Sequence, residues 1–183
     1  MGVNYLTKSV IFIIVYDMLK IVKYPEAILR KTAKTVADFD DDLKKLAENM
    51  AKVMYDDDGI GLAAPQVNVS QRLIVIGSEK GRDYKVYINP EITFSSKDKA
   101  TNEEGCLSLP KIFGLVSRPK KIHVKYQDLE GNVQKEKKSG LEAIVIQHEI
   151  DHLNGILFID RATKIVKGQD ILDDLKSKLN GSK

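Results

Sequence analysis

A His-Glu-Ile-Asp-His run at residues 148–152 places two imidazoles four positions apart around a carboxylate. Residues four apart share one face of a helix, so both imidazoles can reach a single metal ion. Glu149 lies about 100° further round the helix than His148, close enough to act on a water molecule beside the ion without ligating it. The alternative is a pair of core histidines satisfied by hydrogen bonds, but two histidines around a glutamate favour a metal site.

The helix that must carry this run has signals at both ends. Ser139, followed three residues later by Glu142, is typical of a capping box at a helix start. The pair at residues 154–155, Asn-Gly, is typical of a helix end. Apolar residues share the face of His148, which is therefore expected to be buried. They are Leu141, Ile144 and Val145, seven, four and three positions before it.

A catalytic metal site commonly uses three protein ligands and keeps one position open. One protease class takes its third ligand from a histidine six residues after the second, but Phe158 occupies that position. A downstream carboxylate is another arrangement, although the available aspartates alternate with lysines on what we expect to be a solvated helix face; they are Asp170, Asp173 and Asp174. A free cysteine is most often a small buried hydrophobe. Cys106, the only thiol, follows a glycine in a segment of loop character, so a Cys-His-His set is preferred.

A second segment, Gly-Ile-Gly-Leu-Ala-Ala-Pro-Gln at residues 59–66, is small, apolar and punctuated by glycine. It lacks the lysine and hydroxyl of a phosphate-binding loop. Small residues let a peptide backbone approach closely, and Gln66 offers a neutral hydrogen-bond donor at the end of the segment. Taken alone, the segment is also compatible with a tightly packed turn between a helix and a strand.

The chain has 183 residues, 43% of them hydrophobic, which predicts one globular domain. A net charge of only +3 produces no strong positive field, so we expect no specific DNA partner. The sequence shows no internal repeat, which excludes a repeat architecture. The single cysteine excludes an internal disulfide and favours a reducing cytoplasm. The apolar run Val10–Tyr16 is shorter than the roughly 20 residues of a membrane span. We therefore expect no membrane partner, an N-terminal extension of unknown role over residues 1–17, and a single domain over 18–183.

The remaining periodicities predict an α+β fold, with mostly antiparallel strands around the central histidine-bearing helix. An amphipathic helix precedes the strands and a further helix ends the chain. The expected helices cover 39–55 and about 169–179. The expected strands cover 73–76, 85–88 (ending at Asn89-Pro90), 122–126 and 133–138, and His123 is interpreted as a strand surface residue.

Three segments together resemble the signature motifs of the polypeptide deformylases. They are GIGLAAPQ at 59–66, EGCLS at 104–108 and QHEIDHLNG at 147–155, in the order and spacing of that family. The resemblance extends from about Leu19 to Asp160 and includes the KIVKYP start. It implies a catalytic deformylase domain that removes the formyl group from the N-terminal formyl-methionine of nascent polypeptides and releases formate.

The resemblance also implies roles for individual residues. Cys106, His148 and His152 match the metal ligands, and Glu149 matches the general acid and base. Gln66 and the backbone N–H of Leu107 match the donors to the oxyanion. Ile60, Gly61 and Gly105 face the substrate, while Leu141, Ile144 and Val145 are expected to line the methionine pocket. The family implies ferrous iron as the cofactor, whereas the Cys-His-His chemistry alone suits zinc, and nickel is a further occupant.

Two alternatives stay open at this point. One is a zinc endopeptidase, disfavoured by Phe158, and the other is a non-catalytic metal-binding module associated with the ribosome. A set of basic residues is interpreted as the solvated face of a hairpin, with a weak ribosome contact as the functional alternative. These residues are Arg118, Lys120, Lys121, Lys125 and Lys135–Lys138.

Overall fold

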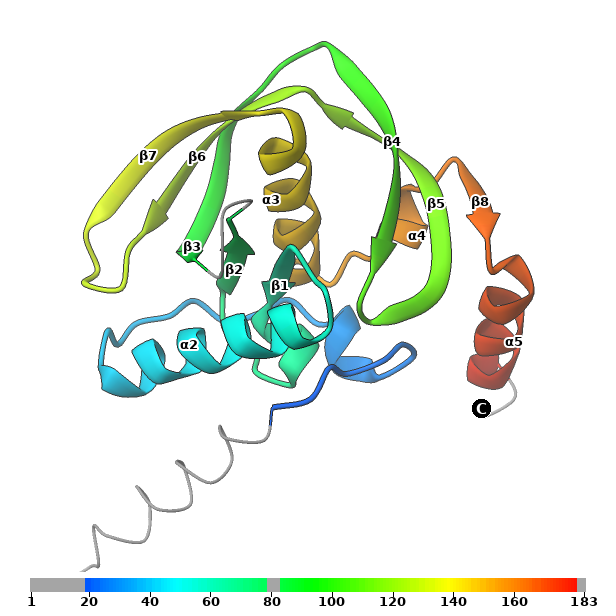
Figure 1. Ribbon diagram of the computed structural model, residues 1–183, viewed down its shortest axis with the longest axis horizontal. Coiled ribbons are helices and arrows are strands. Elements are labelled where there is room, and N and C mark those ends of the chain that lie inside the picture. The colour runs from blue at the N-terminus through cyan, green and yellow to red at the C-terminus, as the bar shows by residue number, and fades with distance from the viewer. Residues whose placement is uncertain (1–18, 79–82, 181–183) are drawn as a thin grey trace, which may run out of the picture.

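A 14-residue helix, α3 (Gly140–Leu153), stands in the middle of the molecule between two antiparallel sheets (Figure 1). The structure is a computed structural model that describes residues 19–78 and 83–180. The extension predicted over residues 1–17 lies outside these described residues. Within them the α+β prediction is confirmed, with the histidine-bearing helix at the centre.

The larger sheet has five strands in the order β1-β2-β3-β6-β7, and the smaller has three in the order β4-β5-β8. All pairings between these strands of the described chain are antiparallel. The first sheet consists of β1 (Gly61–Ala63), β2 (Leu73–Gly77), β3 (Tyr84–Ser95), β6 (Lys121–Gln127) and β7 (Val133–Ser139). The second consists of β4 (Lys99–Cys106), β5 (Leu109–Pro119) and β8 (Lys164–Lys167).

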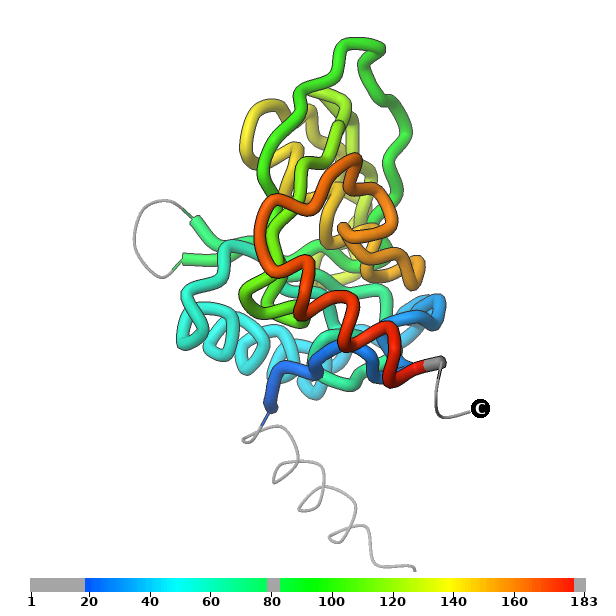
Figure 2. Tube along the Cα trace, turned by 90° about the vertical axis from the view of Figure 1, so that its right-hand side faces the viewer, coloured from blue at the N-terminus to red at the C-terminus, as the bar shows by residue number. Residues whose placement is uncertain are grey.

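The amphipathic helix α2 (Asp41–Asp56) lies across the base of the larger sheet (Figure 1). It begins where the Asp40 carboxylate accepts a hydrogen bond from the Leu43 N–H at 2.9 Å, which satisfies one of the free donors of the first turn. The shorter helical elements are η1 (Ala27–Arg30), η2 (Ala64–Val67) and α4 (Phe158–Arg161). The last helix, α5 (Gln169–Asn180), runs down the outside of the smaller sheet (Figure 2).

Three clusters of buried side chains hold these layers together. One side of α3 packs against the larger sheet through residues such as Ile146 and Ile150. A second cluster joins α2 to β1, β2 and β3. The third, around Phe158 and Leu172, joins β5, α4 and α5 to the N-terminal segment. Because packed elements cover most of α3, nearly every residue from Ala143 to Leu153 is buried, polar ones included.

Two local predictions were wrong. The strand predicted to end at Asn89-Pro90 continues as β3, with a register shift opposite β6 between Ile88 and Glu91. A proline is tolerated there because an irregular pairing does not need its missing N–H. The predicted capping box also fails, since Ser139 precedes α3 but makes no side-chain capping bond. Glu142 instead pairs with Lys138 at 3.0 Å.

No helix among the described residues is long and apolar enough to cross a membrane.

Candidate functional site

Cys106, His148 and His152 come together where β4 meets α3. Their candidate ligand atoms all lie within 4.8 Å of one another, and the Cys106 Sγ is 3.2 Å from the His152 Nε2. The sequence had indicated a loop at Cys106, but the structure shows it as the last residue of β4. A register shift between Gly105 and Cys106 separates the thiol from the regular pairing with β5.

The donor set fits a metal ion. A thiolate and two imidazoles are soft and borderline ligands that suit zinc, iron or nickel. The aspartates that could have supplied a carboxylate ligand lie elsewhere, on α5. Asp173 accepts from Gln169 at 2.8 Å, and Asp174 accepts from Lys178 at 2.6 Å. Phe158, in the sequence position of a third histidine, stacks on the His148 ring with centroids 6.2 Å apart.

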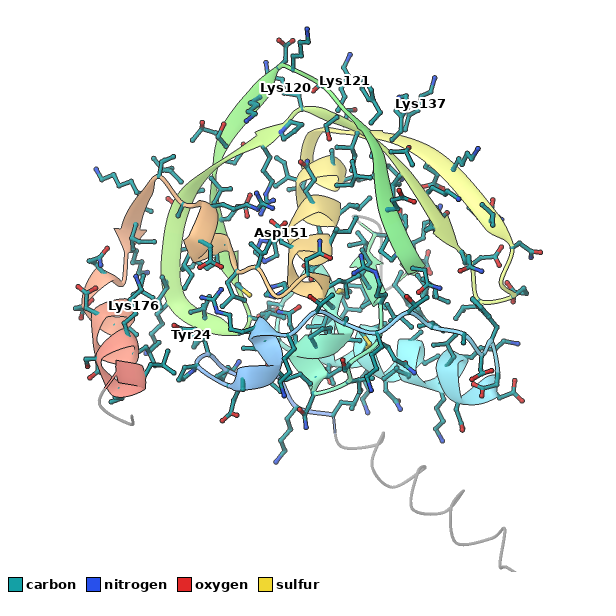
Figure 3. The ribbon with its side chains drawn as sticks, turned by 180° about the vertical axis from the view of Figure 1, so that it is seen from behind. Tyr24, Lys120, Lys121, Lys137, Asp151 and Lys176 are labelled. Atoms are coloured by element: carbon teal, nitrogen blue, oxygen red, sulfur yellow. The ribbon has the colours of Figure 1, made fainter. Side chains whose placement is uncertain are left out.

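A buried ion network stands behind the two histidines. The His148 Nδ1 is 2.9 Å from Glu104 Oε2, so its Nε2 is left for a ligand. Arg118 donates hydrogen bonds to both carboxylate oxygens of Glu104, at 2.6 and 2.9 Å. Its third nitrogen donates to Asp151 Oδ2 at 2.8 Å, and Arg161 donates to both oxygens of Asp151, the shared Oδ2 included, with two bonds of 2.6 Å. Figure 3 shows Asp151 near the middle of the molecule, on α3.

This network sets the charges around the three candidate metal ligands. Burial raises the pKa of Glu104, but hydrogen bonds from His148 and Arg118 outweigh burial and bring the pKa to about 2. Burial lowers the pKa of His148, whereas bonding to Cys106 and Glu104 raises it to about 10. A metal ion bound at His148 would have to displace this proton, because imidazole ligates through a deprotonated nitrogen. Burial, together with the charges of His148 and Arg118, lowers the pKa of His152 and favours its neutral, ligating form.

Sequence reasoning missed this network, and the prediction that Arg118 lies on a solvated hairpin face was wrong. Arg118 is only 3% exposed. In the structure Ile112, Gly114, Val116 and Arg118 share the buried side of β5, but the sequence offered little signal of this because the intervening Phe113 and Leu115 are apolar as well. An inward arginine on such a strand requires buried carboxylates as partners.

Glu149 lies beside the ligands without joining them. It is 4% exposed, and burial raises its pKa to about 7. Its Oε2 is buried and has no hydrogen-bond partner among the described residues. The backbone of Gly61 makes room for it, because a Cβ at Gly61 would lie 2.6 Å from Glu149 Oε1 and 2.7 Å from a methyl group of Val145. Gly61 therefore contributes to the site through the space that its missing side chain leaves.

Gln66 is fixed in one orientation. Its Oε1 accepts the Ala63 N–H at 2.8 Å, so the amide nitrogen is the end that faces the site. That nitrogen lies 3.2 Å from Ser108 Oγ and 3.5 Å from Cys106 Sγ. Leu107 follows Cys106 directly in the turn after β4. Gln66 and Leu107 thus approach the thiol from two different elements.

One pocket of about 640 Å³ connects these groups. Its lining includes all the residues that the sequence assigned to the substrate: Ile60, Gly61, Gly105, Leu141, Ile144 and Val145. Gln66, Cys106, Leu107, His148 and Glu149 line it as well. Leu141 is 52% exposed and marks the rim, whereas Val145 is 7% exposed and lies deep. Phe113, which sequence reasoning missed, packs over Gly105, where a Cβ would lie 2.8 Å from its ring.

A buried carboxylate of raised pKa, set beside a thiol, two imidazoles and an oriented amide in an apolar pocket, is typical of a metal-dependent amide hydrolase. Comparison with known proteins narrows this class. The family model for polypeptide deformylase matches residues 18–168. The peptide deformylase of Desulfotalea psychrophila is 45% identical over 152 residues, which is 81% of this chain and 89% of the relative.

Comparison with solved structures indicates the same family. The crystal structure of peptide deformylase from Thermotoga maritima has a TM-score of 0.77 and 47% identity, and the match covers 80% of this chain and 99% of that one. The peptide deformylase from Synechococcus elongatus in complex with actinonin has a TM-score of 0.78 and 41% identity, covering 87% and 85%. The chain belongs to the polypeptide deformylase family. It is a metal-dependent enzyme that removes the formyl group from the formyl-methionine of nascent polypeptides, and the endopeptidase and non-catalytic alternatives are not favoured.

Replacing Arg118 tests the ion network. Arg118→Met leaves Glu104 and Asp151 without their shared cation, so we expect the free energy of unfolding to fall by about 3–5 kcal/mol. Arg118→Lys keeps the positive charge but loses the several N–H donors of the guanidinium group, so we expect a smaller decrease in the free energy of unfolding. Lys120→Met, an exposed neighbour, is the control and should change stability by less than about 0.5 kcal/mol. Urea unfolding measures all three, and equal stability of the Arg118→Met and Lys120→Met variants would contradict the assignment.

Proposed function

We propose that residues 18–183 form a single catalytic domain in which Cys106, His148 and His152 hold the metal ion. The observation that carries this proposal is the convergence of the three ligand atoms within 4.8 Å, beside a pocket that Cys106, His148, Glu149 and Gln66 line. Following the family resemblance, the ion is ferrous iron, and zinc or nickel can take its place. When bound, the ion supplies Lewis acidity, which polarises a carbonyl group and lowers the pKa of water.

Glu149 transfers a proton from the attacking water to the departing amine. With its pKa near 7, the carboxylate can accept a proton from the attacking water at neutral pH. The same group then returns that proton to the amine of methionine as the bond to the formyl carbon breaks. Gly61 is part of this role, because any larger residue would push Glu149 away from its position.

Gln66 and Leu107 stabilise the charge that collects on the formyl oxygen. The Gln66 amide is held with its nitrogen towards Cys106, and the Leu107 N–H follows the thiol directly in the chain. Donors that are already oriented towards a developing oxyanion lower the barrier by a few kcal/mol each, because they need not reorganise during the reaction.

The methionine side chain occupies the apolar part of the pocket. Leu141, Ile144 and Val145 line it from one face of α3, and each successive residue of this group is less exposed. An unbranched, flexible methionine can fill such a pocket with little strain and gains about 25 cal/mol per Å² of apolar surface buried. Ile60 and the backbone of Gly61 and Gly105 then contact the peptide around the formyl-methionine.

Glu149→Gln tests the proton transfer. The amide has the size of the carboxylate but cannot take up a proton, so kcat should fall by on the order of 10² or more while metal content stays unchanged. Glu142→Gln is the matched control, because Glu142 lies on the same helix, is exposed and pairs only with Lys138. Formate release from a formyl-Met peptide measures both variants. Near-normal turnover of Glu149→Gln would remove Glu149 from the mechanism.

Cys106→Ser tests the ligand set. Loss of the thiolate weakens the site, so the metal content of the purified protein should fall well below one ion per chain. Asp173→Asn, on α5, should leave metal content and formate release unchanged. The opposite pattern, with metal lost from Asp173→Asn and kept by Cys106→Ser, would mean that a carboxylate completes the site.

Because the substrate is the nascent chain, we further propose that the enzyme acts in the cytoplasm and contacts ribosomal RNA through a lysine apex. This apex comprises Lys97, Lys99, Lys120, Lys121 and Lys137. The β3–β4 and β5–β6 turns are joined by the Ser96 N–H to Lys121 C=O bond and the Lys120 N–H to Asp98 C=O bond, both 2.9 Å. Lys137 lies opposite His123 across β6 and β7. Figure 3 shows Lys120, Lys121 and Lys137 at one end of the molecule.

The apex is suited to a phosphate backbone. All five lysines are exposed, and none of them forms an ion pair within the described part of the chain. Lysine binds phosphate as a point charge without reading sequence. Since β7 leads directly into α3, whose Leu141 lines the pocket rim, a contact here would bring the pocket close to the surface of the ribosome.

Charge reversal tests this contact. The triple variant Lys120→Glu, Lys121→Glu and Lys137→Glu should reduce co-sedimentation with ribosomes by about tenfold or more at low salt. The control carries the same charge change at exposed lysines elsewhere: Lys31→Glu, Lys34→Glu and Lys52→Glu. Both should keep wild-type kcat/KM on a formyl-Met tripeptide. Equal losses in the two triple variants would show only a general charge effect and would contradict the proposed surface.

A further inference from the structure

A short N-terminal segment, Val22–Tyr24, contacts both chain segments that carry the proposed oxyanion donors. The Val22 N–H donates to the Gln66 carbonyl at 2.7 Å. The Tyr24 N–H donates to the Ser108 carbonyl at 2.9 Å. Between them, the Lys23 Nζ donates to the Leu107 carbonyl at 2.8 Å. Tyr24 lies near the lower end of β5, close to the turn that follows β4 (Figure 3).

These contacts matter because the two donors come from different elements. Gln66 belongs to η2, whereas Leu107 belongs to the turn between β4 and β5. Apart from the contact of the Gln66 amide nitrogen with Ser108 Oγ at 3.2 Å, neither element by itself sets the distance between the Gln66 amide and the Leu107 N–H. The segment Val22–Tyr24 spans that distance with three hydrogen bonds, two to one side of the site and one to the other.

Lys23 is the only residue of the segment that makes its contact through a side chain. Its ammonium binds the carbonyl of Leu107, so the bond is charge-assisted and stronger than a neutral one. The Leu107 carbonyl belongs to the peptide group after the Leu107 α-carbon and the Leu107 N–H to the peptide group before it, so fixing the carbonyl anchors the turn on one side of the residue that presents the N–H. Lys23 also lines the substrate pocket, together with Leu107 and Gln66.

We propose that Lys23 is a positioning residue for the deformylation reaction, whose ammonium holds the Leu107 turn so that the Leu107 N–H and the Gln66 amide point at one oxyanion. This inference rests on the proposed roles of Gln66 and Leu107. A misplaced donor lowers stabilisation of the transition state more than binding of the ground state, since the charge on the oxygen develops only during the reaction. Loss of Lys23 should therefore reduce kcat and leave KM almost unchanged.

The test compares Lys23→Met, Lys23→Arg and Lys20→Met in the full-length, metal-loaded enzyme. Methionine removes the donor and keeps an unbranched chain, whereas arginine keeps a cationic donor. Lys20 is an exposed lysine two residues before this segment and does not line the substrate pocket. Formate release from a formyl-Met tripeptide gives kcat and KM, and metal content and thermal unfolding are measured on each variant.

We expect Lys23→Met to lower kcat by about three- to tenfold with KM within about twofold of wild type. Lys23→Arg should recover at least half of the lost kcat, and Lys20→Met should match wild type. An increase in KM at unchanged kcat would overturn the inference and make Lys23 a substrate-binding cation. Wild-type kinetics of Lys23→Met would overturn it as well. Failure of the wild-type enzyme to release formate would instead contradict the proposed function.

Discussion

A buried carboxylate is stable only where cations and hydrogen-bond donors meet it, and this constraint organises the site. Glu104 on β4 and Asp151 on α3 are both buried, and Arg118 on β5 is the cation that they share. These three side chains belong to three different elements, so the hydrogen bonds of Arg118 fix β4, β5 and α3 relative to one another. Cys106 lies two residues beyond Glu104, and His148 and His152 flank Asp151. The ion network therefore sets the distance between the thiol and the imidazoles.

Space is the second constraint on the chemistry. Glu149 follows His148 on α3, and it can stay buried with a raised pKa because Gly61 has no side chain that would collide with it. Gln66 approaches through η2, directly after the strand that contains Gly61. Strand β1 thus makes room for the Glu149 carboxylate through Gly61 and leads directly into the turn that positions the Gln66 amide. As the edge strand of the larger sheet, β1 pairs with β2 and packs against α2 and α3, which holds this three-residue strand in place.

The sequence predicted those parts of the site that depend on local geometry. Two histidines four apart share a helix face whatever surrounds the helix, and the stripe through Leu141, Ile144 and Val145 follows from the same periodicity. The Arg118 network could not be read in the same way, because its carboxylates are 14 and 33 residues away and meet it only in the tertiary structure. The end of β3 and the cap of α3 were wrong for a similar reason. In both cases a partner outside the local pattern, the bulge opposite β6 or the side chain of Lys138, decided the outcome.

The most direct test of this account is a crystal structure of the iron-loaded enzyme with an anomalous difference map collected at the iron absorption edge. The account predicts one ion, bonded at about 2.0–2.4 Å to Cys106 Sγ and to the Nε2 atoms of His148 and His152. Glu104, held by Arg118, should still contact the His148 Nδ1, and Glu149 should lie beside the ion without bonding to it. An ion bonded to a carboxylate in place of Cys106, or a His148 ring turned so that its Nδ1 binds the metal, would contradict it.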